Sequence, residues 1–216
     1  MPNTAIYLGP SLPVAAALGI LEAAYLPPIR RGDLARLPAD IKCIGIVDGE
    51  FYQSLAVSPK EILPFLERGV RVFGASSMGA LRAVELESYG MVGVGRIFEW
   101  FRDGAIDAED EVALVYDPET CRALSQPLVN IRVALYAAAE RGIIDASEAS
   151  ALIGELRQLW FPERSYRLVS RLCPALAPFL AGHPPDQKAD DARLLLETIR
   201  AQSESPAAGR PAFAKL

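Results

Sequence analysis

The sequence predicts a layered α/β fold, with a mainly parallel sheet in the N-terminal half and a helical C-terminal half. Three short apolar runs, at residues 4–9, 41–47 and 70–75, have the composition of strands, and helix-like segments separate them. This alternation is typical of parallel sheets, whose ligands bind at the carboxyl ends of the strands. After Asp117-Pro118 apolar residues recur at helical spacing only.

Turn and capping residues define the expected elements in chain order. Gly-Pro closes the first strand, Asp48-Gly49 closes the second, and Ser58-Pro59 opens a helix. A fourth strand is expected over 111–116. The expected helices cover 12–25, 59–68, 78–88, 128–141, 146–159, 163–173 and 187–201.

The length of 216 residues suits one compact domain with a helical appendage. We expect a core with its helical extension over 1–180, and a linker and C-terminal helix over 181–202. The proline-rich stretch at 174–187 precedes that helix. Residues 203–216 are expected to form a mobile tail.

Composition excludes several classes of function. A net charge of −5 without a basic stripe argues against a nucleic-acid partner. The apolar segment 12–26 contains Glu22 and is too short to span a membrane, so it predicts a buried helix. Three widely spaced cysteines without a CxxC motif suggest reduced thiols and a cytoplasmic protein.

Metal and nucleotide cofactors are also not expected. His183 is the single histidine and lies in a predicted loop, so zinc sites that need two or three histidines cannot form. The glycines of Gly93-Val94-Gly95 begin a dinucleotide-binding pattern, but Phe98 replaces its third glycine and no strand is expected before it. The sequence therefore predicts no cofactor.

The stretch 72–82 contains the strongest candidate nucleophile. Its centre, Ala75-Ser76-Ser77-Met78-Gly79, matches a G-x-S-x-G elbow with alanine for the first glycine, and Ser77 stands at the nucleophile position. The backbone N–H groups of Met78 and Gly79 are candidates to bind an oxyanion. The alternative is that the serines only cap the following helix. Neighbouring candidates for substrate contact are Gly74, Ser76 and Arg82.

A serine nucleophile needs a base, and Lys60 is the lysine best placed to be one. It begins the helix before the strand that leads to Ser77, and a right-handed β-α-β unit brings its loop to the same sheet edge. A helix N-terminus and burial would both lower the pKa of this amine. The alternative is an exposed first-turn lysine. The other lysines, expected in a strand, an exposed helix and the tail, are Lys42, Lys188 and Lys215.

An acidic run follows at Asp107, Glu109, Asp110 and Glu111. We expect these carboxylates to contact a protein partner and not a metal, because they lack the glycine-bearing loop of a calcium site. A solvated loop is the alternative.

Longer motifs resemble the core of the TfuA family: SMGALRAVEL, YGMVGVGRIFEWFRDG, EDEVALVYDP and PLVNIR. With Gly9-Pro10-Ser11-Leu12 and Lys60-Glu61-Ile62-Leu63, the resemblance extends over about residues 4 to 135. It implies a partner of a YcaO enzyme, which activates backbone amides with ATP during peptide thioamidation. It also implies that the family's catalytic serine falls on Ser77 and its lysine on Lys60.

The resemblance implies a hydrolase that frees sulfide from the C-terminal thiocarboxylate of a ThiS-like carrier protein. The expected function is therefore a Ser-Lys thiocarboxylate hydrolase that works beside a YcaO enzyme. The alternative is a non-catalytic adaptor that docks the carrier or the peptide on that enzyme. The sequence leaves the formation of a homo-oligomer open.

Overall fold

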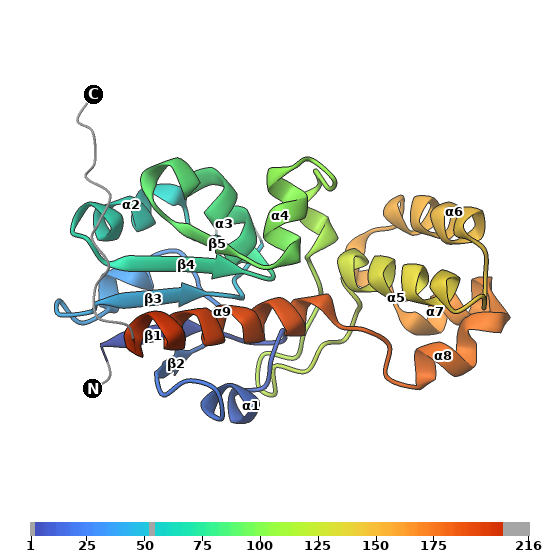
Figure 1. The fold of residues 1–216 in the computed structure, drawn as a ribbon, viewed down its shortest axis with the longest axis horizontal. Helices are drawn as coiled ribbons and strands as arrows, with labels where there is room; N and C mark the ends of the chain where they lie inside the picture. The colour runs from blue at the N-terminus through green and yellow to red at the C-terminus, as the bar shows by residue number, and fades with distance from the viewer. Residues whose placement is uncertain (1–2, 52–54, 205–216) are drawn as a thin grey trace.

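The computed structural model describes residues 3–51 and 55–204 and confirms the α/β fold class. In this part of the chain a parallel sheet has the strand order β2-β1-β3-β4-β5 (Figure 1). Its strands are β1 (Thr4–Tyr7), β2 (Ala24–Leu26), β3 (Cys43–Ile46), β4 (Arg71–Ala75) and β5 (Val92–Val94).

Helices make up most of the chain beyond β5. The helices of the first half are α1 (Val14–Leu18), α2 (Pro59–Glu67), α3 (Met78–Leu86) and α4 (Arg96–Arg102). Those of the second half are α5 (Leu128–Glu140), α6 (Ala146–Arg157), α7 (Tyr166–Leu172), α8 (Ala177–Ala181) and α9 (Gln187–Glu204). Among the described residues, no helix is both long and apolar enough to cross a membrane.

The two faces of the sheet bury alternate residues of each strand. Ile44 and Val72 pack on one face in a core with α2, α3 and α4. Cys43 and Phe73 pack on the other face, where α1 and α9 cover the sheet. Both faces of the central strands are therefore buried, as expected for parallel strands.

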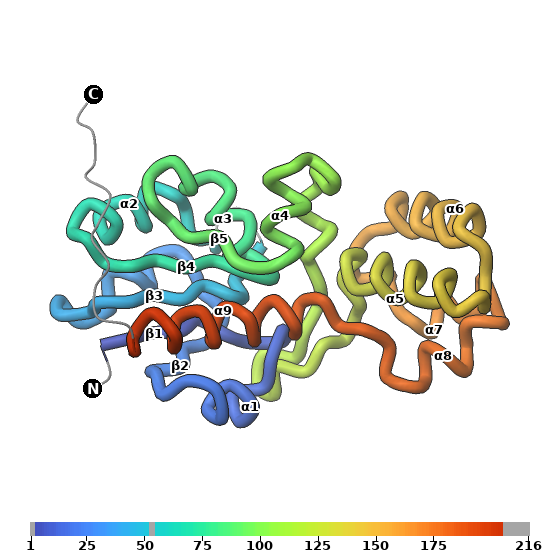
Figure 2. The backbone as a smooth tube through the Cα atoms, viewed as in Figure 1, coloured from blue at the N-terminus to red at the C-terminus, as the bar shows by residue number. Residues whose placement is uncertain are grey.

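Helix α9 returns from the far end of the molecule to lie on the sheet (Figure 2). It contacts β3, β4 and β5, and its core residues include Leu195 and Ile199. A Cβ atom at Gly45 would press against both of these side chains, so the glycine lets the helix approach closely. The last described helix is thus part of the sheet core.

Helices α5 to α8 pack around a separate apolar cluster, to one side of the sheet in Figure 1. Two ion pairs, each with one fully buried side chain, join this helical unit to the segment after α4. Arg132 binds Glu111 through two hydrogen bonds of 2.5 and 3.0 Å, and Arg164 donates to the carbonyl and carboxylate of Asp110.

Two expected elements differ in the structure. The segment 12–25 does not form one helix, because α1 ends at Leu18 with Gly19 as its C-cap, and β2 then pairs with β1. The expected strand over 111–116 does not form, since β5 occupies the sheet edge beside β4. Backbone groups in that segment bind side chains instead: Val112 O accepts from Lys188 Nζ, and Val115 N donates to Ser125 Oγ.

The C-terminal boundary also differs. Residues 203 and 204 belong to α9 and not to a tail, and residues 205–216 lie outside the described residues. The predicted domain boundary at residue 180 stays a prediction.

Candidate active site

Ser77 lies in the sharp connection between β4 and α3. The preceding Ser76 has φ 67°, in the left-handed region that non-glycine residues rarely adopt, which turns the chain abruptly. A Cβ atom at Gly79 would overlap the carbonyl oxygen of Ile46, and one at Gly74 would overlap that of Gly79. The two glycines therefore allow α3 to pack closely on the sheet, and their predicted role in substrate contact stays a prediction.

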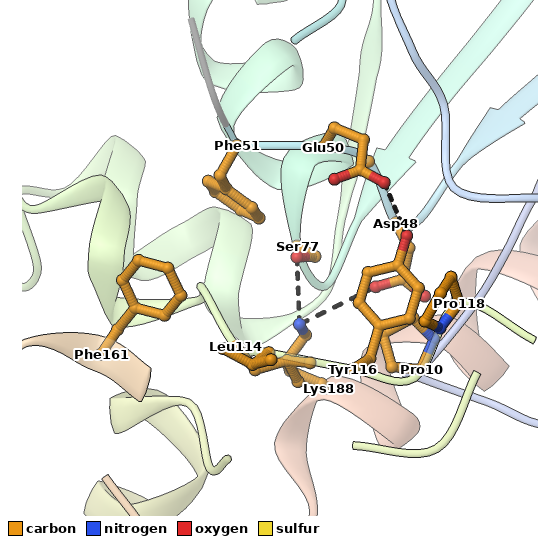
Figure 3. Close-up of a pocket in the computed structure, with 12 residues that line it drawn as sticks. Pro10, Asp48, Glu50, Phe51, Ser77, Leu114, Tyr116, Pro118, Phe161 and Lys188 are labelled. Carbon is orange, nitrogen blue, oxygen red and sulfur yellow. Dashed lines mark hydrogen bonds and ion pairs between the residues drawn. The ribbon is translucent and has the colours of Figure 1, made fainter. Parts of the chain in front are cut away.

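The hydroxyl of Ser77 meets the amine of Lys188 at the base of a pocket (Figure 3). Lys188 Nζ donates to Ser77 Oγ at 3.0 Å and to Val112 O at 2.9 Å. Although Ser77 occupies the N-cap position of α3, its side chain makes no capping hydrogen bond. The structure thus favours a serine paired with an amine over a simple helix cap.

Burial changes the acid–base chemistry of Lys188. Its side chain is 2% exposed, and burial lowers the pKa of the amine because the charged form loses its hydration. The carboxylates of Asp48 and Asp186 act in the opposite direction, and the Asp48 Oδ1 lies 3.8 Å from Lys188 Nζ. The net effect favours the neutral amine, the form that can accept a proton.

Asp48 is held by a network that includes the second serine of the elbow. Its Oδ2 accepts from the backbone N–H groups of Gly9 and Ser11 at 2.9 and 3.0 Å. Its Oδ1 accepts from the Ser11 hydroxyl at 2.6 Å, and Ser76 Oγ in turn donates to Ser11 Oγ. Ser76 therefore helps to fix a negative charge beside Lys188, and its hydroxyl does not cap α3.

The backbone of Lys188 is fixed by neighbours from the helical unit. Its N–H donates to Asn130 Oδ1 at 3.1 Å, and Asn130 Nδ2 donates to Asp186 Oδ1 at 2.8 Å. One turn along α9, the Asp191 carboxylate accepts from the N–H groups of Arg96 and Ile97 at the start of α4. The position of the amine relative to Ser77 is thus defined from two sides.

The pocket above the pair has a volume of about 230 Å³. Figure 3 shows Phe51 and Phe161 on one side of Ser77, and Tyr116 and Pro118 on the other. Tyr116 donates to Glu50 Oε1 at 2.7 Å. Burial raises the pKa of the Tyr116 hydroxyl above the ordinary value for tyrosine. The walls therefore offer mostly apolar and neutral groups, which strengthens electrostatic interactions with Ser77 and Lys188.

Only one of the two predicted oxyanion donors is available. The N–H of Gly79 already donates to the carbonyl of Val47 at 3.2 Å. Met78 is the first residue of α3, where helical N–H groups have no acceptor within the helix. The N–H of Met78 is therefore the candidate oxyanion donor that remains.

The structure does not bring Lys60 to Ser77. Lys60 is exposed at the second residue of α2, whereas the buried serine hydroxyl is paired with Lys188. The expectation that Lys188 lies on an exposed helix face was wrong. Lys188 precedes Ala192, Leu195 and Ile199 by four, seven and eleven residues, which places it on the buried stripe of α9. That spacing is a signal in the sequence that Lys188 is buried, although it does not show what the lysine contacts.

The remaining predicted contacts have partners within the chain. Arg82 is buried and pairs with Glu85 at 2.7 Å, and it does not line the Ser77 pocket. Glu111 is 1% exposed and bound by Arg132, so it cannot reach a partner protein. Asp110 pairs with Arg164 and Asp107 with Arg157. Partner binding by the exposed part of the acidic run, which includes Glu109, stays a prediction.

The described part of the chain also shows the surroundings of the other motifs discussed from the sequence. It contains no cluster of three or more histidine, cysteine, aspartate or glutamate residues that could hold a metal ion. The start of α4 after Gly95 is occupied by the Asp191 carboxylate, which leaves its N–H groups unavailable to a dinucleotide phosphate. Cys43 is buried, which raises the pKa of its thiol to about 11.

Comparison with known families gives a match to the model of the TfuA-like protein family over residues 48–165. The match covers more than half of the chain and includes Asp48 and Ser77. It ends before Lys188. No curated protein matches the chain.

Proposed function

The chain belongs to the TfuA-like family, and on this premise we propose that it is a Ser-Lys hydrolase that releases sulfide from a thiocarboxylated ThiS-like carrier. In this proposal it works beside a YcaO enzyme that thioamidates a peptide backbone. The observation that carries the proposal is the buried hydrogen bond of 3.0 Å between Ser77 and Lys188. A lysine that favours its neutral form beside a serine is the arrangement that nucleophilic catalysis without histidine requires.

The first half of the reaction forms an acyl-serine. Neutral Lys188 accepts the proton of the Ser77 hydroxyl while Ser77 Oγ attacks the carbonyl carbon of the carrier's terminal thiocarboxylate. The C–S bond of the tetrahedral intermediate then breaks. The proton on Lys188 passes to the departing sulfur, so that hydrogen sulfide ion leaves and an ester joins the carrier to Ser77.

The second half returns the enzyme to its starting state. Lys188 accepts a proton from water, and the resulting hydroxide adds to the ester carbonyl. The C–O bond to Ser77 breaks, and the proton returns to Ser77 Oγ. The new carboxyl group of the carrier loses the remaining proton of the water to solvent, so the carrier leaves as a carboxylate. The N–H of Met78 is the candidate donor to the oxyanion in both halves.

Asp48 has a supporting role in this scheme. Its carboxylate is held by Gly9 and Ser11 and lies 3.8 Å from the amine, so it stabilises the ammonium that forms when Lys188 takes a proton. A base must gain a proton during the reaction and lose it afterwards. Burial lowers the pKa of Lys188 and Asp48 raises it, so the two effects together set how readily the amine gains and loses this proton.

The test is release of sulfide from a thiocarboxylated carrier by purified protein. Ser77→Ala should reduce the rate by about 10³-fold or more, because it removes the nucleophile. Ser88→Ala, at an exposed serine after α3, is the matched control and should keep the wild-type rate. An unchanged rate in Ser77→Ala, or no sulfide release by the wild type, would favour the adaptor function.

A further inference from the structure

A second, larger cavity lies against the edge of the sheet formed by β1 and β2. Its volume is about 770 Å³, more than three times that of the Ser77 pocket. Ala5 and Tyr7 of β1 and Ala24 and Leu26 of β2 form its floor, and Leu37 lies in its wall. We call this cavity the β2 groove.

The β2 groove meets the Ser77 pocket. Pro118 lines both cavities. Hydrogen bonds also connect residues of the two linings. Arg30, which lines the groove, donates to Glu50 at 3.1 Å. Glu50 lines the pocket and accepts from Tyr116. The shared wall at Pro118 is therefore the place where an extended ligand of the Ser77 pocket would enter the groove.

The Ser77 pocket by itself is too small for a polypeptide substrate. Sites for small ligands usually measure about 300 to 1,000 Å³, and this pocket falls below that range. An extended chain advances about 3.3 Å per residue, so only the terminal residue or two can lie beside Ser77. The residues before them must lie outside the pocket.

The lining of the β2 groove suits an extended peptide with an apolar side chain. Its floor and walls are largely aliphatic, and the charges at its rim are paired, since Asp33 binds Arg36 and the backbone of Arg30. Tyr7 lines the groove, and its hydroxyl makes no hydrogen bond to the described residues. This oxygen is not one of the fully buried polar atoms, so it is open to the groove and can donate to a peptide carbonyl.

We infer that the β2 groove binds the residues that precede the reacting terminus of the carrier, with an aliphatic side chain against Leu26 and a peptide carbonyl on the Tyr7 hydroxyl. The inference rests on the proposed function, because the occupant is the carrier's extended C-terminal segment. The Ser77 pocket holds the thiocarboxylate, and the groove selects the sequence upstream of it.

A positional scan tests this assignment. The probes are acetylated nonapeptides of serine and alanine that end in glycine thiocarboxylate and carry one leucine, moved from the second to the seventh position before the end. The wild-type protein should show a maximum in kcat/KM at one upstream position. We expect at least about a ten-fold preference over the leucine-free peptide, as burial of one leucine provides.

Two variants locate the preference in the groove. Ala24→Trp fills the groove from β2 and should reduce the preference to within about two-fold. Val14→Trp places the same side chain at an exposed position of α1 and is the control that should keep the preference. Tyr7→Phe removes only the hydroxyl, so kcat/KM should fall by about three- to ten-fold for all the peptides, and the preferred leucine position should stay unchanged. Thermal unfolding shows whether each variant is folded.

The outcomes separate the groove from the proposed function. A flat profile in the wild type, or a maximum that persists in folded Ala24→Trp, overturns the groove. If acetylglycine thiocarboxylate and all the nonapeptides release no sulfide, the proposed hydrolase function fails. The groove is then tested by the dissociation constants of the same peptides prepared as carboxylates. Affinity that depends on the leucine position in the wild type and loses this dependence in Ala24→Trp supports the groove. Affinity that does not depend on the leucine position overturns it.

Discussion

At Lys188, burial of the amine and the proposed role as a general base both favour the neutral form of the side chain. Burial disfavours the charged form, and a general base must be neutral before it accepts a proton. At its ordinary pKa of ~10.4, fewer than about one lysine in a thousand is neutral at pH 7. The buried position of Lys188 therefore favours the neutral form that a general base requires.

The pH dependence of sulfide release should report this ionisation. The rate should rise with pH as Lys188 loses its proton, and it should reach a plateau below the range in which free lysine titrates, because the pKa of Lys188 is lowered. Stopped assays from pH 6 to 10 measure the profile. A rate that follows the titration of free lysine would contradict a base at this position.

Lys188→Arg tests the need for a neutral base separately. The guanidinium keeps the positive charge but does not give up its proton, so the rate should fall by about 10²- to 10⁴-fold. Lys60→Ala is the control and should leave the rate unchanged, since the side chain is exposed on α2. Substantial turnover by the arginine variant would mean that position 188 contributes only charge.

The serine of this pair could be predicted from the sequence, but its partner could not. The small residues around Ser77 form a local pattern that is visible in one stretch of chain. The contact with Lys188 joins residues 111 positions apart and depends on where α9 packs. Helical spacing places Lys188 on the apolar stripe, but only the fold shows which surface that stripe covers.

At the scale of single elements, Gly79 determines how closely α3 approaches the sheet. Gly79→Ala should destabilise the protein by more than about 4 kcal/mol or prevent folding, because the new Cβ overlaps the carbonyl oxygen of Ile46. Gly154→Ala in α6 is the matched control: nothing lies near its Cβ, and it should stabilise by about 0.5 to 1 kcal/mol. Urea unfolding measures both, and equal effects would contradict the packing argument.

The ion pair between Arg132 of α5 and Glu111 joins the helical unit to the sheet unit. Arg132→Ala leaves the buried Glu111 carboxylate without its partner and should destabilise by about 3 kcal/mol. Arg193→Ala removes an exposed pair with Asp190 and should change stability by less than about 1 kcal/mol. Chemical denaturation compares the two, and a loss of similar size in both variants would argue against a structural role for Glu111.

Elements with local signals were predicted well, and those set by pairing were not. Ser58-Pro59 and the helical periodicity of 128–141 identified α2 and α5 to within a residue or two. The three-residue strand β5 was not predicted, because its glycine weakens the strand pattern. Its conformation depends on pairing with β4. The same pairing leaves 111–116 outside the sheet.

At the scale of the whole molecule, stability and the candidate site both depend on α9. Leu195→Asp should unfold the protein or destabilise it by more than about 4 kcal/mol, because this side chain is fully buried against the sheet. Its neighbour Leu194 is 45% exposed, and Leu194→Asp should change stability by less than about 0.5 kcal/mol. The thermal unfolding temperature and the rate of sulfide release should both fall in Leu195→Asp and stay unchanged in Leu194→Asp.

The position of Lys188 late in the chain has a consequence during translation. A nascent chain that has already folded β1 to β5 carries Ser77, but it cannot form the pair before the ribosome has made α9. Until then the face of the sheet with Phe73 also lacks its covering helix, so the unfinished chain presents apolar surface that chaperones recognise. Completion of the core and completion of the candidate site therefore coincide, and a truncated translation product would hold Ser77 without the amine of Lys188.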